Sequence, residues 1–156
     1  MRRRADGPRP AAALGAALEF LQHLWRLNHA LERLSLRMEA TLGVTAQQRL
    51  VIRCLGKRPG MTAGQLAALL HLDPGTISAA LRRLERKGLL ARRRDPRDRR
   101  RVTVELTAAG LALDRPAPGT VEHAVAGLLR ASRSTQVEAT TALLGRLIVR
   151  LEREAG

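Results

Sequence analysis

The sequence predicts a mainly helical protein with a small two-stranded β-hairpin set between its helices. Three observations predict this fold class. Apolar residues recur at helical spacing over most of the 156 residues, capping residues precede these periodic stretches, and one segment near residue 100 alternates like a strand. A chain of this length with 45% hydrophobic residues can form one domain, or two lobes that share a long helix.

The N-terminal segment predicts a disordered basic arm over residues 1–9 and one long amphipathic helix over residues 10–43. Pro10 suits the first helical position, and Gly43 suits the end. The apolar stripe comprises Leu14, Leu18, Leu21, Trp25, Leu31, Leu34, Met38 and Leu42. Because a small globule cannot bury so long a stripe, we expect this helix to pack on a partner chain.

Three shorter helices follow, each with its own start signal. Thr45 with Gln48, and Thr62 with Gln65, have capping-box spacing. Asp73 before a proline predicts the start of a third, which runs to Lys87 and stops at Gly88. The second and third of these helices are short and joined by a turn at His71-Leu72, which predicts a helix-turn-helix.

A β-hairpin is predicted next. Residues 89–93 form the first strand, the turn residues Asp95-Pro96-Arg97-Asp98 follow, and Val102, Val104 and Leu106 alternate with polar residues in the second strand. A helix-turn-helix with this hairpin is a winged helix-turn-helix. Thr107 then caps another helix, a loop is expected at residues 116–119, helix resumes over 121–130, and the last helix starts at Ser134 or Thr135.

The charge distribution points to a polyanion. Residues 82–101 hold eleven Lys or Arg against three acids, and so carry +8 of the formal +14. A helix that enters the major groove, joined to a basic hairpin that reaches phosphates, suits double-stranded DNA. The few aromatic residues, Phe20 and Trp25 with no Tyr, argue against readers of single strands or RNA.

Other function classes find little support. The single cysteine, Cys54, excludes an intrachain disulfide and a Cys-rich zinc site, and we expect no metal site and no cofactor. We find no catalytic motif, so we do not expect an enzyme. The longest uncharged run, residues 59–72, is too short for a membrane helix, and a cytoplasmic protein is predicted.

Residues 62–110, and above all LERKGLL followed by DPRDRRRVTVELTAAG, resemble the MarR family (multiple antibiotic resistance regulators) of bacterial transcription factors. The resemblance spans residues from about 12 to 154. It implies a homodimer that binds a pseudo-palindromic operator. The implied domains are an N-terminal dimerisation helix (10–43), a winged helix-turn-helix DNA-binding domain (44–110) and C-terminal dimerisation helices (111–156).

The recognition helix and the wing supply the expected DNA contacts. On the helix these are Gly75, Thr76, Ser78, Ala79, Arg82 and Arg83, since Ile77, Ala80, Leu81 and Leu84 face the core. Relatives often have a base-reading arginine where this chain has Ala79, so specificity is expected to shift to Arg82, Arg83 or the wing. The hydroxyls of Thr76 and Ser78 suit phosphate or base edges, or else ordinary helix capping.

In the wing, the resemblance implies that Asp98 braces the turn and that Arg100 enters the minor groove, with Arg97 as the alternative tip residue. The expected phosphate contacts are Arg92, Arg93, Arg94 and Arg99. Each arginine taken alone is as easily explained as part of a solvated surface.

Sensing is the least determined part of the function. His23, Trp25, Arg26 and His29 of the first helix are candidates for a small-molecule effector pocket, although ordinary packing and surface roles are the simpler interpretation. Cys54 invites comparison with the peroxide-sensing branch of the family. That branch carries its reactive cysteine near the first helix, so a buried structural role for Cys54 is favoured.

Together these features predict a dimeric, sequence-specific transcription regulator, most simply a repressor that a small-molecule effector releases. The alternative is an architectural DNA-binding protein without an effector, which Ala79 and the very basic wing would permit. The two classes differ in how strongly they prefer their own site over unrelated DNA.

Overall fold

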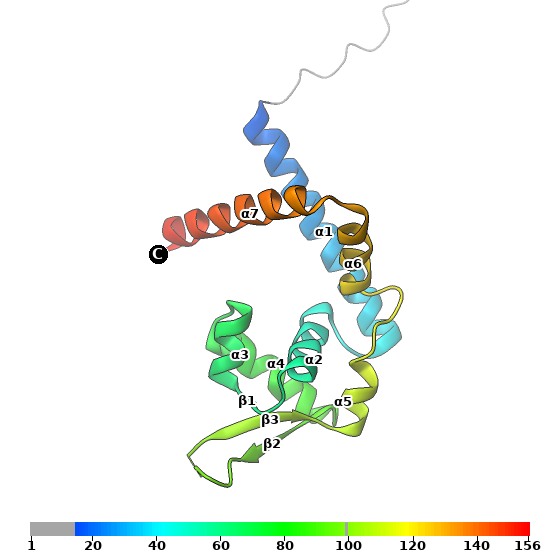
Figure 1. Ribbon diagram of the computed structural model, residues 1–156, viewed down its shortest axis with the longest axis vertical. Coiled ribbons are helices and arrows are strands. Elements are labelled where there is room, and N and C mark those ends of the chain that lie inside the picture. The colour runs from blue at the N-terminus through cyan, green and yellow to red at the C-terminus, as the bar shows by residue number, and fades with distance from the viewer. Residues whose placement is uncertain (1–14, 99) are drawn as a thin grey trace, which may run out of the picture.

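The computed structural model describes residues 15–98 and 100–156. Over these residues the chain forms helices, three short strands and their connections (Figure 1). In chain order the elements are α1 (Ala16–Leu42), α2 (Ala46–Lys57), β1 (Met61–Thr62), α3 (Ala63–Leu70), α4 (Pro74–Arg86), β2 (Leu90–Arg94), β3 (Val102–Leu106), α5 (Ala108–Leu113), α6 (Val121–Ala131) and α7 (Ser134–Ala155).

The predicted helix starts are confirmed by their hydrogen bonds. The Thr45 hydroxyl accepts from the Gln48 amide at 3.2 Å, and Thr62 accepts from Gln65 at the same distance. Both capping boxes are complete, because each glutamine side chain also accepts from the amide of its threonine. Thr107 caps α5 more simply, because its hydroxyl accepts from the Gly110 amide at 3.2 Å without a reciprocal side-chain bond. Four polar residues including Asp73 therefore define where the helices of the lobe begin.

Three predicted boundaries need correction. The helix α1 begins at Ala16 after the extended N-cap Gly15. The predicted start at Pro10 and the predicted basic arm lie outside the described residues. The first wing strand spans Leu90–Arg94 and not residues 89–93, because its pairing with β3 begins at Leu90 opposite Leu106. The α4 helix ends at Arg86, with Lys87 as its C-cap. Such shifts reflect how weakly the sequence marks the first and last residues of an element.

The sheet has three strands where two were predicted. Its order is β1-β3-β2, with both pairings antiparallel. The additional strand β1 pairs Met61 with Val104 and Thr62 with Thr103. A strand of two residues, the second of which is the cap Thr62 itself, shows no alternation, so sequence offered no sign of it. Its effect is to tie the start of α3 to the wing.

The core of the winged lobe lies between α2, α3, α4 and the inner face of the sheet. Its fully buried side chains include Val51, Ile52, Leu66, Ile77 and Val104. Burying each such aliphatic side chain stabilises the fold by about 1.5–3 kcal/mol. The buried residues predicted for α4, Ile77, Ala80, Leu81 and Leu84, are all in this core. The recognition helix is therefore fixed firmly in the lobe.

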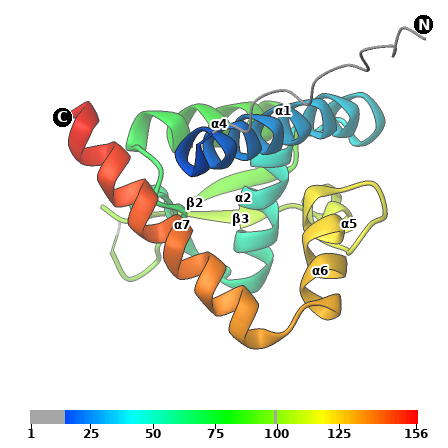
Figure 2. The ribbon, with the colours of Figure 1, turned by 90° about the horizontal axis from the view of Figure 1, so that it is seen from above.

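The remaining helices stand above the lobe. In Figure 1, α1 and α7 cross above it, and Figure 2 shows α6 and α7 joined by a turn into a V. Met38 is the only buried residue of α1, and α6 and α7 bury none within the described chain. Nor is any helix of the described part both long and apolar enough to span a membrane.

Candidate nucleic-acid interface

The outward face of α4 is the centre of the candidate interface. Gly75, Ala79, Arg82 and Arg86 recur at steps of four, three and four residues, so they share the face opposite buried Ile77, Leu81 and Leu84. Both arginines on this face are exposed. Arg83 lies on the flank of this face by its helical position. A shallow groove beside Glu39 of α1 and Thr45 is lined by both Arg83 and Arg86. Sequence reasoning missed Arg86, although its spacing from Arg82 was the available signal.

The N-terminus of α4 is organised by its own cap. Asp73 accepts a hydrogen bond from the Thr76 amide at 2.8 Å and a second one from the Thr76 hydroxyl. The hydrogen bond from the Thr76 side chain is the main reason that the pKa of Asp73 lies below its usual value. The Thr76 hydroxyl thus serves the cap. Gly75 stays exposed, and Ser78 half-buried, along the first turn of the helix.

Local hydrogen bonds shape the tip of the wing. Asp95 Oδ1 accepts from the Arg97 amide at 2.9 Å, and Asp98 Oδ1 accepts from the Arg100 amide at 3.0 Å. The amide of Arg101 donates to the Asp98 carbonyl. These are the bonds that a bracing role for Asp98 requires, and they leave the guanidinium of Arg100 out of the turn. Arg99 is outside the described residues.

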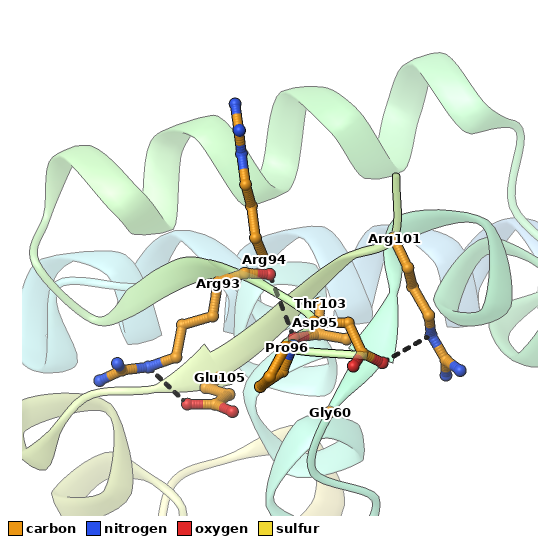
Figure 3. Close-up of a pocket in the computed structure, with 8 residues that line it drawn as sticks. All are labelled: Gly60, Arg93, Arg94, Asp95, Pro96, Arg101, Thr103 and Glu105. Atoms are coloured by element: carbon orange, nitrogen blue, oxygen red, sulfur yellow. Dashed lines mark hydrogen bonds and ion pairs between the residues drawn. The ribbon is translucent and has the colours of Figure 1, made fainter. Parts of the chain in front are cut away.

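Carboxylates hold three of the wing arginines. Arg92 Nε lies 3.2 Å from Glu85 of α4, Arg93 Nε lies 2.8 Å from Glu105 of β3, and Arg101 Nε lies 3.9 Å from Asp95. Figure 3 shows the second and third of these pairs around a hollow beside the outer half of the wing, with Arg94 extending away from them. The hollow measures about 640 Å³. The basic charge of this segment is therefore partly neutralised from within.

The basic residues of α4 and Arg94 of the wing differ in whether they have a partner within the described chain. Lys87 donates to the Gly43 carbonyl at 2.6 Å, so it joins α4 to the end of α1. In the part of the chain that the structure describes, no carboxylate pairs with Arg82, Arg83, Arg86 or Arg94. These four arginines are free to meet phosphates or base edges.

The first-helix residues proposed for an effector pocket do not converge in the single chain. His23, Trp25, Arg26 and His29 are all exposed, Trp25 to 69%. A cavity of about 730 Å³ lies lower, between α2, the end of α3 and α6, and none of the four lines it. Its walls are mostly apolar, with polar groups from Arg53, Glu122, His123 and Arg130.

Cys54 is half-buried on α2 and packs against the core of the lobe. Burial raises the pKa of its thiol, and the nearby Arg58 only partly offsets this effect. A raised pKa leaves less thiolate, which is the reactive form. This environment agrees with a structural role.

Comparison with known proteins shows which family this winged helix-turn-helix resembles. Residues 44–102 match the model of the MarR family, and they contain the helix-turn-helix and the start of β3. The winged helix-turn-helix of this chain is a MarR-family domain.

Curated relatives agree with the MarR assignment. An organic hydroperoxide resistance transcriptional regulator of Bacillus subtilis is 35% identical over 83 residues, which are 51% of this chain and 56% of that protein. An HTH-type transcriptional repressor of Mycobacterium tuberculosis is 33% identical over 88 residues, which are 56% of this chain and 63% of the repressor. The matched segments thus span roughly half to two thirds of these relatives' lengths.

Solved structures extend the MarR-family likeness to the outer helices. The PcaV transcriptional regulator from Streptomyces coelicolor, solved with its natural ligand, is 28% identical and superposes with a TM-score of 0.65. That match covers 94% of this chain and all of PcaV. The S. aureus MepR–DNA complex has a TM-score of 0.67 at 24% identity, covers 84% of this chain and 97% of MepR, and supports the shared fold.

Proposed function

We propose that this protein is a dimeric transcription regulator that binds a specific duplex DNA operator and acts in the cytoplasm. The observation that carries the proposal is the outward face of α4, where two exposed arginines stand beside a basic wing. Lodged in the major groove, this face would present Arg82 and Arg86 to base edges. The names of its relatives, a regulator and a repressor, favour regulation of transcription by repression.

The dimer is proposed from unpartnered apolar surface. In α7, Leu144, Leu147, Ile148 and Leu151 recur at helical spacing, yet the helix buries no residue within the described chain. Along α1, Leu18, Trp25 and Leu36 are likewise more than half exposed. A second copy is the simplest partner for both helices, because one twofold axis would cover them together.

An effector is proposed from the cavity beneath α6. A volume of about 730 Å³ is within the range of small-molecule sites. Apolar walls with arginines at two points suit a small aromatic or aliphatic anion. Release of DNA by such a molecule is the proposed mode of control. The four exposed residues of the first helix remain candidates for a pocket that forms only in the dimer.

The architectural alternative is favoured by one observation, the apolar Ala79 at the centre of the DNA-facing surface. Selection of binding sites from a random duplex library tests both functions. A regulator should enrich a palindromic motif and bind it at least 10³-fold more tightly than unrelated DNA, roughly the lower end of known specificity ratios. Enrichment of no motif would favour the architectural alternative.

A further inference from the structure

Arg49 of α2 is the most deeply buried charged residue of the described chain, with a 1% exposed side chain. Its guanidinium makes three interactions. Nε pairs with Glu122 Oε1, Nη1 donates to the Leu113 carbonyl at 2.7 Å, and Nη2 donates to the Arg115 carbonyl at 2.6 Å. Each of the three nitrogens of the planar guanidinium therefore has one partner, and the three partners lie in fixed directions.

All three partners lie on the connection from the end of α5 to the first turn of α6. The same face of α2 meets this connection twice more, at the next two helical steps. Arg53 pairs with Asp114 at 2.7 Å, and a Cβ on Gly56 would lie 1.9 Å from Asp114 Oδ2. Residues 49, 53 and 56 thus form one row on α2 that contacts the segment of residues 113–122.

This row joins two parts that have different tasks. Helix α2 packs against α4 and β3, so it moves with the recognition helix and the wing. Helix α6 leads directly into α7, whose apolar stripe requires a partner. The orientation of α6 against α2 therefore sets where each recognition helix stands relative to the proposed dimer.

Stability alone is a poor reason for such a residue. Well-packed apolar residues commonly stabilise a core as much as a buried ion pair does. Their contacts are not directional, however, so they fix the relative position of two helices less strictly than hydrogen bonds do. A guanidinium with three fixed acceptors permits one relative position. Glu122 is the side-chain acceptor of this set, and it is one-third exposed.

We propose that Arg49, through Glu122, is a positioning residue for DNA recognition. It holds the winged lobe at one angle to α6, and in this way fixes the separation of the two recognition helices and the half-site spacing that the dimer accepts. This inference rests on the proposed function, because it presumes a dimer that reads two half-sites.

The test uses Glu122→Gln in the full chain, with Glu152→Gln on the exposed end of α7 as the matched control for charge. The wild-type protein first selects an operator from random duplex DNA. Binding is then measured at fixed salt to that operator, to versions with half-sites moved by one base pair, and to unrelated duplex. Glu122→Gln should lose on the order of tenfold on the selected operator and discriminate less between spacings.

Three further measurements separate positioning from folding. Sedimentation should show an unchanged dimer, and binding of Glu122→Gln to unrelated duplex should match that of the Glu152→Gln control. Arg49→Lys, which keeps the charge but loses the fork, should reproduce the loss of spacing preference. A Glu122→Gln protein that ranks the spacings as the wild type does would overturn the inference. A wild type that enriches no duplex would instead overturn the proposed function.

Discussion

Single residues on α4 decide what the candidate interface can read. If α4 enters the major groove, as proposed, Ala79 offers only a methyl group there, and polar reading of bases depends on the arginines one and two turns further along the helix. Arg82 and Arg86 share that outward face, whereas Arg83 stands on its flank by its helical position. The three arginines are close in sequence, yet their positions on the helix predict different effects.

Substitution of Arg86 by alanine should relax sequence preference. If its guanidinium reads a guanine edge, the loss should be about 1–3 kcal/mol at one or two operator positions and little on unrelated duplex. Arg83→Ala is the matched control, since it removes the same charge from the flank. Titration of both variants against operator mutants decides the matter. The same loss on every duplex for both variants would show that Arg86 contacts phosphate only.

Arg100 should act through the shape of the minor groove. Its backbone amide is held by Asp98, which fixes where the side chain starts. Narrow A·T-rich grooves attract arginine through their negative potential, so Arg100→Ala should weaken binding most on operators that are A·T-rich beneath the wing. Binding to operators that differ only in those base pairs measures the effect. A loss of affinity that is the same whatever the A·T content beneath the wing would contradict a minor-groove role.

Gly110 shows how one residue positions an element. A Cβ at this position would lie 2.0 Å from the Leu89 carbonyl oxygen, because α5 begins directly against the start of the wing. Gly110→Ala should therefore destabilise the fold by about 1–3 kcal/mol in denaturant titrations. Gly64→Ala in α3, where a Cβ meets no atom closer than 4.0 Å, should be neutral or slightly stabilising. Equal stability of the two variants would refute the close contact.

At the scale of elements, the wing is a hairpin whose charge is restrained by acids. Glu85 and Glu105 hold Arg92 and Arg93, and the pairs are exposed enough to contribute only about 0–1 kcal/mol to stability. Their larger effect concerns DNA. Arginines held by carboxylates are less available to phosphates, so in the proposed complex we expect these pairs to limit binding to sequences other than the operator.

Removal of Glu85 should increase unspecific binding. Glu85→Gln frees Arg92, so each protomer of the dimer gains about one phosphate contact and the slope of log affinity against log salt should steepen by roughly two. Unfolding should be nearly unchanged. The Glu152→Gln variant supplies the same charge change far from the wing. If both variants shift the salt slope alike, net charge alone is responsible.

At the scale of the whole molecule, α1 and α7 each leave apolar side chains exposed within the described chain. In Figure 1, α7 stands clear of the winged lobe, and its stripe includes Ile148 and Leu151, both more than half exposed. Surface of this extent on long helices is typical of an interface and atypical of a monomer. This exposed apolar surface is the basis of the proposed dimer.

Charge on this stripe should dissociate the dimer. Ile148→Glu places a carboxylate where the interface must be dry, so sedimentation at micromolar concentration should show monomers and operator binding should fall steeply. Arg153→Glu on the basic side of α7 is the control for charge. A wild type that sediments as a monomer would exclude the dimer altogether.

The whole dimer should bind DNA with strong dependence on salt. About 6–10 phosphate contacts predict a loss of ~10³–10⁵ in affinity between 50 and 200 mM salt. Binding titrations on one duplex across this range measure the slope. A nearly flat dependence would mean that the basic segment does not face the backbone of DNA.

By itself, the sequence determined the helices, the wing hairpin and the basic charge of this protein. Caps such as Thr45 and Thr62 act on amides three residues away, and helical periodicity is local, so neither needs tertiary information. The helix-turn-helix, the hairpin and the buried side of α4 were therefore predictable, and so was the family resemblance.

Only the tertiary structure decided the contacts between distant segments. The strand β1 exists because Val104 lies beside Met61. Arg49 connects α2 to α6 because the chain folds back and brings Glu122 beside α2. Likewise, the pairing of Arg92 and Arg93 with acids, and the place of the cavity, depend on how the elements meet. The physical reason is that such contacts join residues far apart in the chain, for which local spacing carries no signal.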